Sequence, residues 1–188
     1  MPVTSKQNQH QLLELSQDLV PMAASLVDSG ITYFSWARYF EDGTHAVLAN
    51  QTDWLSHFFT KGYNVHRRSL EFSRPASDFP DGQFLWCTLD RGAPVVIDAV
   101  NEFNIDNGIS KIIQHEDYCD FFHFGSTRDQ DEIVNFYINN LDYLDHFTQR
   151  FIEQGQGLVT KALSQRIVVE TKPEPNDELL IDVDTYQK

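Results

Sequence analysis

The chain is short of basic residues and of long apolar runs, and each shortage excludes a class of protein. Its 188 residues include 14 Lys and Arg against 28 Asp and Glu, which gives a formal net charge of −14. Such a chain has no electrostatic footprint for binding phosphates along a duplex, so we expect it to bind DNA poorly by itself. No apolar run approaches the roughly 18 residues of a membrane span, and the polar start does not resemble a signal peptide. The expected location is the cytoplasm, with no membrane contact.

The chain also has only two cysteines and none of the common catalytic motifs. The two cysteines, Cys87 and Cys119, stand in apolar surroundings without metal-ligand spacing, which favours reduced core thiols over a disulfide. The chain contains no GxSxG motif, P-loop, HExxH motif or glycine-rich dinucleotide turn. His115, Glu116 and Asp117 are adjacent, but they have the composition of a solvated turn. We therefore predict no catalytic residue, no cofactor and no metal.

Residues 99–125 are the stretch around which we expect the rest of the chain to fold. Residues 108–114 are dominated by β-branched side chains and residues 118–125 by aromatic ones, so both are predicted strands. The polar residues 115–117 between them form the predicted turn of a hairpin. We expect this hairpin at the centre of a sheet.

The second strand of this hairpin is apolar on both faces. Because side chains alternate along a strand, Cys119, Phe121 and His123 share one face, while Phe122 and Phe124 share the other. A strand of this kind is typical of a sheet covered on both sides. We therefore expect helices above and below it.

The remaining elements follow from periodicity and turn signals. Helices are predicted over residues 8–29, 54–61, 95–103, 129–154 and 158–165, and strands over residues 31–40 and 45–49. Pro21 predicts a kink or a break in the first helix, and residues 50–53 are predicted to cap the second. Residues 63–82 are predicted to form a wrapping loop, 83–89 a short apolar segment, and 167–170 a short strand or the start of a linker.

This order predicts an α+β fold, an α-β-α sandwich with a central antiparallel sheet, as in PAS- or GAF-like sensor domains. Residues 1–170 form the predicted domain, and residues 171–188, which are acidic and contain proline, form a predicted linker or tail.

Aromatic residues make up 13% of the chain, which suits either an aromatic-lined cavity or a bulky core. His123 among aromatic neighbours needs hydrogen-bond partners, which are either protein groups or a bound polar molecule. Trp54 and Trp86 each have a flat apolar ring and one N–H donor, so each could contact a bound molecule or simply complete the core. A small enzyme using His123 with Asp120 or Asp106 is a third interpretation, but no nucleophile completes such a site.

The aromatic residues also occur in a familiar order. They are, in sequence, Trp54, Phe58, Tyr63 after Gly62, Trp86, residues 102–109 and residues 122–124. This order and spacing resemble the autoinducer-binding domain of LuxR-type transcription regulators, over roughly residues 10–165. The resemblance implies an α-β-α sandwich that binds an acyl-homoserine lactone or another small signal between the sheet and one helical layer. It also implies a homodimer, and DNA binding only through a helix-turn-helix domain that this chain lacks.

The resemblance assigns roles to individual residues. Trp54 matches the tryptophan whose indole N–H meets the lactone carbonyl, and Trp86 matches the tryptophan that packs against the ring. Phe58 stands where a tyrosine is usual, Tyr63 matches a second pocket-side tyrosine, and His123 stands where a small hydroxyl residue commonly contacts the ligand amide.

The chain departs from the family at Arg67, which with its neighbour stands where an Asp-Pro pair is expected. A carboxylate acceptor has thus become a cationic donor. With the bulk of Phe121 and His123, this predicts a smaller or chemically different ligand with an anionic or acceptor group. The predicted ligand-binding residues are Trp54, Phe58, Tyr63, Arg67, Trp86, Cys119, Phe121 and His123. We expect a small-molecule sensor domain; the alternative is a protein-interaction module with a filled aromatic core.

Overall fold

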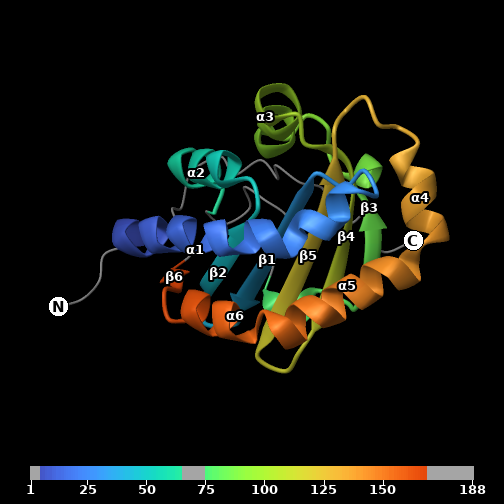
Figure 1. The fold of residues 1–188 in the computed structure, drawn as a ribbon. Helices are drawn as coiled ribbons and strands as arrows, with labels where there is room; N and C mark the ends of the chain where they lie inside the picture. The colour runs from blue at the N-terminus through green and yellow to red at the C-terminus, as the bar shows by residue number, and fades with distance from the viewer. Residues whose placement is uncertain (1–4, 65–74, 169–188) are drawn as a thin grey trace.

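A six-stranded antiparallel sheet forms the centre of the computed structural model, which describes residues 5–64 and 75–168 (Figure 1). The strand order is β3-β4-β5-β1-β2-β6. The strands are β1 (Tyr33–Phe40), β2 (Thr44–Ala49), β3 (Gly82–Leu85), β4 (Asp106–Gln114), β5 (Tyr118–Ser126) and β6 (Ile167–Val168). The predicted central hairpin is confirmed as β4–β5, and β5 lies between β4 and β1. Of the two possibilities predicted for residues 167–170, a short strand or the start of a linker, the strand is found at Ile167–Val168, which pair with β2.

Helices cover both faces of this sheet (Figure 1). They are α1 (Ser5–Val27), α2 (Thr52–Thr60), α3 (Pro94–Phe103), α4 (Ile133–Asn139), α5 (Leu141–Gln154) and α6 (Gln156–Leu163). α1, α5 and α6 lie on one face and α2 and α3 on the other, while α4 lies at the side of β4. The predicted α-β-α sandwich with a central antiparallel sheet is therefore confirmed.

Strand β5 is buried on both faces, as its sequence predicts. On one face Phe124 packs against Phe34 of β1, with ring centroids 5.2 Å apart. Phe34 in turn meets Phe147 of α5 edge-on at 4.9 Å. On the other face, Phe121 and His123 point toward the layer of α2 and α3. Each fully buried aromatic side chain contributes about 1.5–3 kcal/mol to folding, so this double burial makes β5 the centre of the core.

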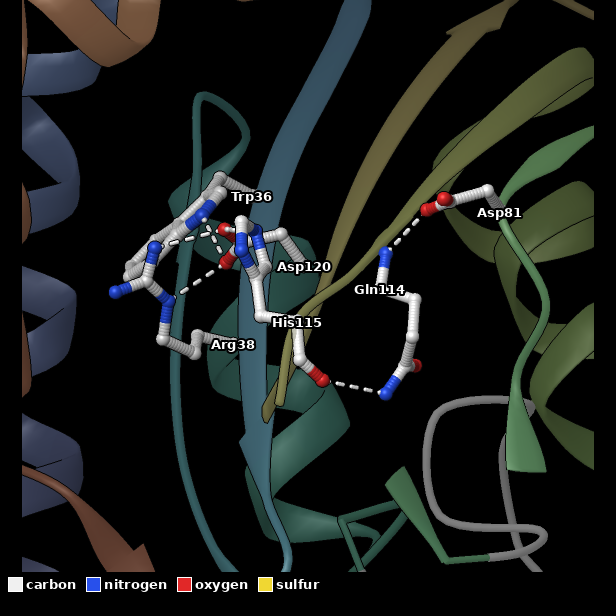
Figure 2. Close-up of polar contacts among 6 residues, drawn as sticks. All are labelled: Trp36, Arg38, Asp81, Gln114, His115 and Asp120. Carbon is white, nitrogen blue, oxygen red and sulfur yellow. Dashed lines mark hydrogen bonds and ion pairs between the residues drawn. The ribbon is translucent and has the colours of Figure 1, made fainter. Parts of the chain in front are cut away.

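A polar cluster lies on the α5 face of the sheet (Figure 2). Asp120 is 2% exposed, and its Oδ1 accepts hydrogen bonds from Trp36 Nε1 at 3.0 Å and Arg38 Nε at 2.8 Å. Its Oδ2 accepts from Arg38 Nη2 at 2.7 Å, and His115 Nε2 lies 3.5 Å away. The Arg38 guanidinium lies 3.9 Å from the ring centroid of Tyr118. The cluster joins β5 to β1 through a paired charge.

One helix prediction is wrong in detail, and one of the two alternatives predicted for another helix does not occur. The helix predicted over residues 129–154 is two helices, because Asn140 has φ −134° and ψ 40°, which ends α4 before α5 begins. Of the two outcomes predicted for Pro21, a kink or a break, the break does not occur, since α1 runs through that residue. Pro21 and Gln17 are both exposed, so the proline, which cannot donate a hydrogen bond to the Gln17 carbonyl, lies on the solvent side of the helix.

The predicted cap on α2 is also wrong. The N-cap residue is Gln51, and no side-chain hydrogen bond caps this helix. The Asn50 side chain instead binds the backbone at the start of β1, because it accepts a hydrogen bond from the Phe34 N–H and donates one to the Thr32 carbonyl. Cys119 is a buried free thiol as expected, but Cys87 is exposed, because it lies in the short 3₁₀ helix η3 (Trp86–Thr88) after the edge strand β3.

Some predictions fall on residues that the structure does not describe. The predicted binding residue Arg67 and the predicted tail 171–188 lie outside the described residues. In the described part of the chain, no helix is long and apolar enough to cross a membrane.

Candidate functional site

A cavity of about 110 Å³ lies between the sheet and the layer formed by α2 and α3. The sheet contributes Tyr33, Phe84, Ser110 and His123, and the helices contribute Trp54, Phe58, Val95, Val96, Ala99 and Val100. The segments that connect these elements add Trp86, Leu89, Arg91 and Ile105, and Asp106 begins β4. The wall is mostly aromatic and aliphatic with a few polar groups, which is the usual composition of a small-molecule site.

Four of the predicted binding residues line this cavity together: Trp54, Phe58, Trp86 and His123. The two indoles and the imidazole therefore border one hollow. Their role in binding a ligand remains a prediction, since proximity alone does not show it.

Tyr63 was predicted on the cavity wall, but its hydroxyl is used elsewhere. Tyr63 Oη donates to Asp98 Oδ2 at 2.7 Å, and His57 Nε2 donates to the same oxygen at 2.7 Å. These hydrogen bonds lower the pKa of the Asp98 carboxyl from its usual value, with Tyr63 the larger cause. Because Asp98 belongs to α3 and His57 to α2, the carboxylate joins the two helices that cover the cavity.

Cys119 and Phe121 were also predicted to line the cavity, and they do not. Both lie on the cavity face of β5, but beyond His123, where Phe79 packs edge-on against Phe121 with centroids 4.9 Å apart. Burial raises the pKa of the Cys119 thiol to about 12, so the thiolate is strongly disfavoured. The alternation of side chains correctly predicted the face of β5 on which these residues lie. They are too far along the strand from His123 to line the cavity.

Trp86 rests on a surface formed by two glycines. A Cβ atom at Gly108 would lie 2.3 Å from the indole, and one at Gly125 would lie 2.9 Å from it. The indole Nε1 donates to Ser110 Oγ at 2.7 Å, and Ser110 Oγ lies 2.6 Å from His123 Nδ1. A hydroxyl can accept one hydrogen bond and donate another, so Ser110 links the two predicted residues. Sequence reasoning missed Ser110, although it pairs directly with His123 once the hairpin register is known.

Arg91 and Asp106 form an ion pair at another part of the wall. Arg91 Nη1 lies 2.6 Å from Oδ1 and Nη2 lies 2.9 Å from Oδ2, so the guanidinium engages both carboxylate oxygens. This pairing lowers the pKa of the Asp106 carboxyl. The Arg91 side chain is 51% exposed, whereas that of Asp106 is 11% exposed. The Asp106 carboxylate therefore lines the cavity with its negative charge paired to the Arg91 guanidinium.

This pair predicts a defined pH dependence of stability. The folded-state pKa of Asp106 lies below its unfolded value of about 3.9, so its contribution is complete above about pH 4 and declines as the pH falls through the folded-state pKa. We expect Asp106→Asn to lower the free energy of unfolding by about 1 kcal/mol at neutral pH, since half-exposed Arg91 is screened by solvent. Urea unfolding should show this difference narrowing toward about pH 3.

The exposed residue Asp18 on α1 provides the control for that experiment. Asp18→Asn should leave stability within about 0.5 kcal/mol of the parent at both pH values. If the difference in free energy of unfolding between the parent and Asp106→Asn grew as the pH fell, the lowered folded-state pKa of Asp106 would be contradicted.

Trp54 differs from Trp86 in its hydrogen bonding. Its ring meets Phe103 edge-on at 5.2 Å and stacks on His57 at 6.0 Å, which fixes its plane. Within the described part of the chain, its indole N–H makes no hydrogen bond. Trp54 is 6% exposed and lines the cavity, so a molecule in the cavity could accept this hydrogen bond.

The acid–base pairs considered for an enzyme are not assembled. Asp120 lies on the opposite face of β5 from His123 and is bound by Trp36 and Arg38. Asp106 lines the same cavity as His123, but both of its oxygens are held by Arg91. Among residues 5–64 and 75–168, no group of three or more His, Cys, Asp and Glu side chains is placed to hold a metal ion.

Comparison with known proteins identifies the fold. No protein-family model matches the chain, and no curated protein matches it by sequence. Among solved structures, it is similar to CepR2 from Burkholderia cenocepacia, described as an N-acylhomoserine lactone dependent LuxR family transcription factor. The TM-score is 0.53 at 16% identity, over 80% of this chain and 96% of CepR2. The two proteins share a fold.

The predicted resemblance to LuxR-type sensor domains is therefore confirmed at the level of the fold. Two structures of SdiA are also similar at 14% identity, one of the Escherichia coli protein and one described as a complex with octanoyl-rac-glycerol. Their TM-scores are 0.47 and 0.45, with 93% and 92% of this chain covered and 67% and 71% of theirs.

Proposed function

We propose that this chain is the sensor domain of a LuxR-type transcription regulator and that its signal, a small molecule, binds in the cavity between the sheet and the layer of α2 and α3. The observation that carries the proposal is the position of Trp54. A buried indole that lines a hollow, and whose N–H makes no hydrogen bond within the described part of the chain, is suited to a ligand carbonyl.

The fold supports this proposal, because CepR2, which shares it, is described as dependent on an N-acylhomoserine lactone. The cavity also favours a sensor over the alternative, an interaction module with a filled core, since both indoles border open space. Ligand binding to the folded dimer would stabilise that form by mass action and so couple the signal to dimerisation.

A thermal-shift screen of lactones and other small carbonyl compounds tests the proposal. A ligand at about 100 times its Kd should raise the melting temperature by roughly 5–10 °C. Trp54→Phe keeps the wall but removes the donor, so affinity should fall about tenfold, which is the worth of one neutral hydrogen bond. Sedimentation of the same samples should show a larger dimer fraction with the ligand.

Tyr143→Phe is the matched control, because Tyr143 is an exposed residue of α5 that does not line the cavity. It should leave the affinity unchanged. The proposal fails if no compound raises the melting temperature, or if Trp54→Phe and Tyr143→Phe bind the same ligand equally well.

A further inference from the structure

We infer that the cavity takes a compact, neutral molecule, and that His123 is the residue that limits its length. This inference rests on the proposed function, since it names the class of ligand and the residue that selects it. Three observations carry it: the end of the cavity at His123, the rigid support of that ring, and the paired charges on the wall.

Among the residues that the structure describes, the cavity extends along β5 only as far as the His123 imidazole. His123 lines it, whereas Phe121, the next residue on the same face of β5, does not. The two rings are stacked with centroids 5.9 Å apart and planes 19° from parallel. Beyond them Phe79 closes the space against Phe121. A ligand that extended along β5 would therefore have to displace the imidazole first.

The imidazole is fixed in this position. Ser110 Oγ lies 2.6 Å from Nδ1, and Ser110 also accepts the Trp86 indole proton. Trp86 cannot retreat toward the sheet, because Gly108 and Gly125 already lie against its ring. Rotating His123 out of the way would leave buried polar groups without their hydrogen bonds, which is costly in an apolar site.

The charged groups on the wall favour a neutral ligand. The guanidinium of Arg91 already binds both oxygens of Asp106, so it has no matching fork for a ligand carboxylate. An anionic ligand that took over Arg91 would leave the nearly buried Asp106 carboxylate without its partner. As far as the described wall residues go, an acceptor group is thus favoured over an anion, the two ligand chemistries predicted from the sequence.

The size of the cavity agrees with this class of ligand. It measures about 110 Å³, whereas pockets for drug-sized ligands measure about 300–1,000 Å³. The cavity is smaller than the apolar cavity of about 150 Å³ that accommodates benzene, so a ligand larger than a single small ring requires its walls to move apart. A single ring bearing a carbonyl matches this space better than a ring with a long acyl chain.

Three probes separate these features in the full chain: acetophenone, which is compact and neutral, benzoate, which is compact and anionic, and N-octanoyl homoserine lactone, which carries a chain. We expect acetophenone to raise the melting temperature of the parent more than either of the others. His123→Ser should bind N-octanoyl homoserine lactone at least about tenfold more tightly than the parent, as expected when room is made for added methylenes.

His10→Ser is the matched control, because His10 is an exposed residue of α1 that does not line the cavity; it should behave as the parent with all three probes. His123→Thr, which retains a branched side chain, serves if the serine variant does not fold by circular dichroism. Equal binding of the lactone by the parent and the folded His123 variants overturns the length limit, and stronger binding of benzoate than acetophenone overturns the neutral class. Both results leave the proposed function intact, whereas no shift with any probe in any variant contradicts the function itself.

Discussion

Asp120→Ala is expected to lower the free energy of unfolding by about 3 kcal/mol, the lower end of the range for buried pairs, because it leaves a half-buried guanidinium without its partner. Asp120 accepts hydrogen bonds from Trp36 and Arg38, and the Arg38 side chain is only 18% exposed (Figure 2). Removing the carboxylate also leaves the Trp36 indole N–H unbonded in the core. Urea unfolding followed by circular dichroism measures the loss.

Two further variants separate charge from packing. Asp120→Asn keeps an acceptor for Trp36 and should cost less than Asp120→Ala. The double variant Asp120→Leu with Arg38→Met removes both charges and should recover much of the loss, as apolar replacements of buried pairs often do. Asp18→Ala on the exposed face of α1 should stay within about 0.5 kcal/mol of the parent. A similarly small effect of Asp120→Ala would show that the pair contributes nothing to stability.

The fold was predictable because its signals are local. Alternation along residues 118–125 and the turn at residues 115–117 defined the central hairpin, and its apolar faces indicated two covering layers. The break between α4 and α5 was missed for a physical reason. The apolar stripe continues through Tyr137 and Leu144, so nothing in the periodicity marks the backbone change at Asn140.

The candidate site was predictable only in part, because hydrogen-bond partners are set by tertiary contacts. His123 was predicted from the alternation of side chains along its strand and from the resemblance, and Trp54 from the resemblance. Both line the cavity. Tyr63 was assigned to the wall through the resemblance alone, and its sequence position does not reveal Asp98, 35 residues away, which binds its hydroxyl. The Arg91–Asp106 pair was missed for the same reason, since Asp106 was considered only as a partner of His123, and the sequence does not reveal that Arg91, 15 residues earlier, binds its carboxylate.

Gly108→Ala is expected to lower the free energy of unfolding by about 3 kcal/mol, at the upper end of the usual cost of overpacking. The added Cβ would lie 2.3 Å from the Trp86 ring, which is a rigid group without a flexible end to move aside. To relieve the clash the indole must move into the cavity, which would break its hydrogen bond to Ser110. The same variant should therefore lose ligand-induced stabilisation, measured by thermal shift alongside urea unfolding.

Gly157→Ala provides a control in which the same added methyl group has room. Apart from the neighbouring residues and backbone of α6 itself, no described atom lies within 4 Å of a Cβ at Gly157, so alanine should raise stability by about 0.5–1 kcal/mol through its helix preference. Adding Trp86→Phe to Gly108→Ala replaces the indole with a smaller ring and should restore part of the lost stability. If Gly108→Ala were as stable as Gly157→Ala and bound ligand normally, Trp86 would not be held against the sheet, and the shape derived for the cavity would be wrong.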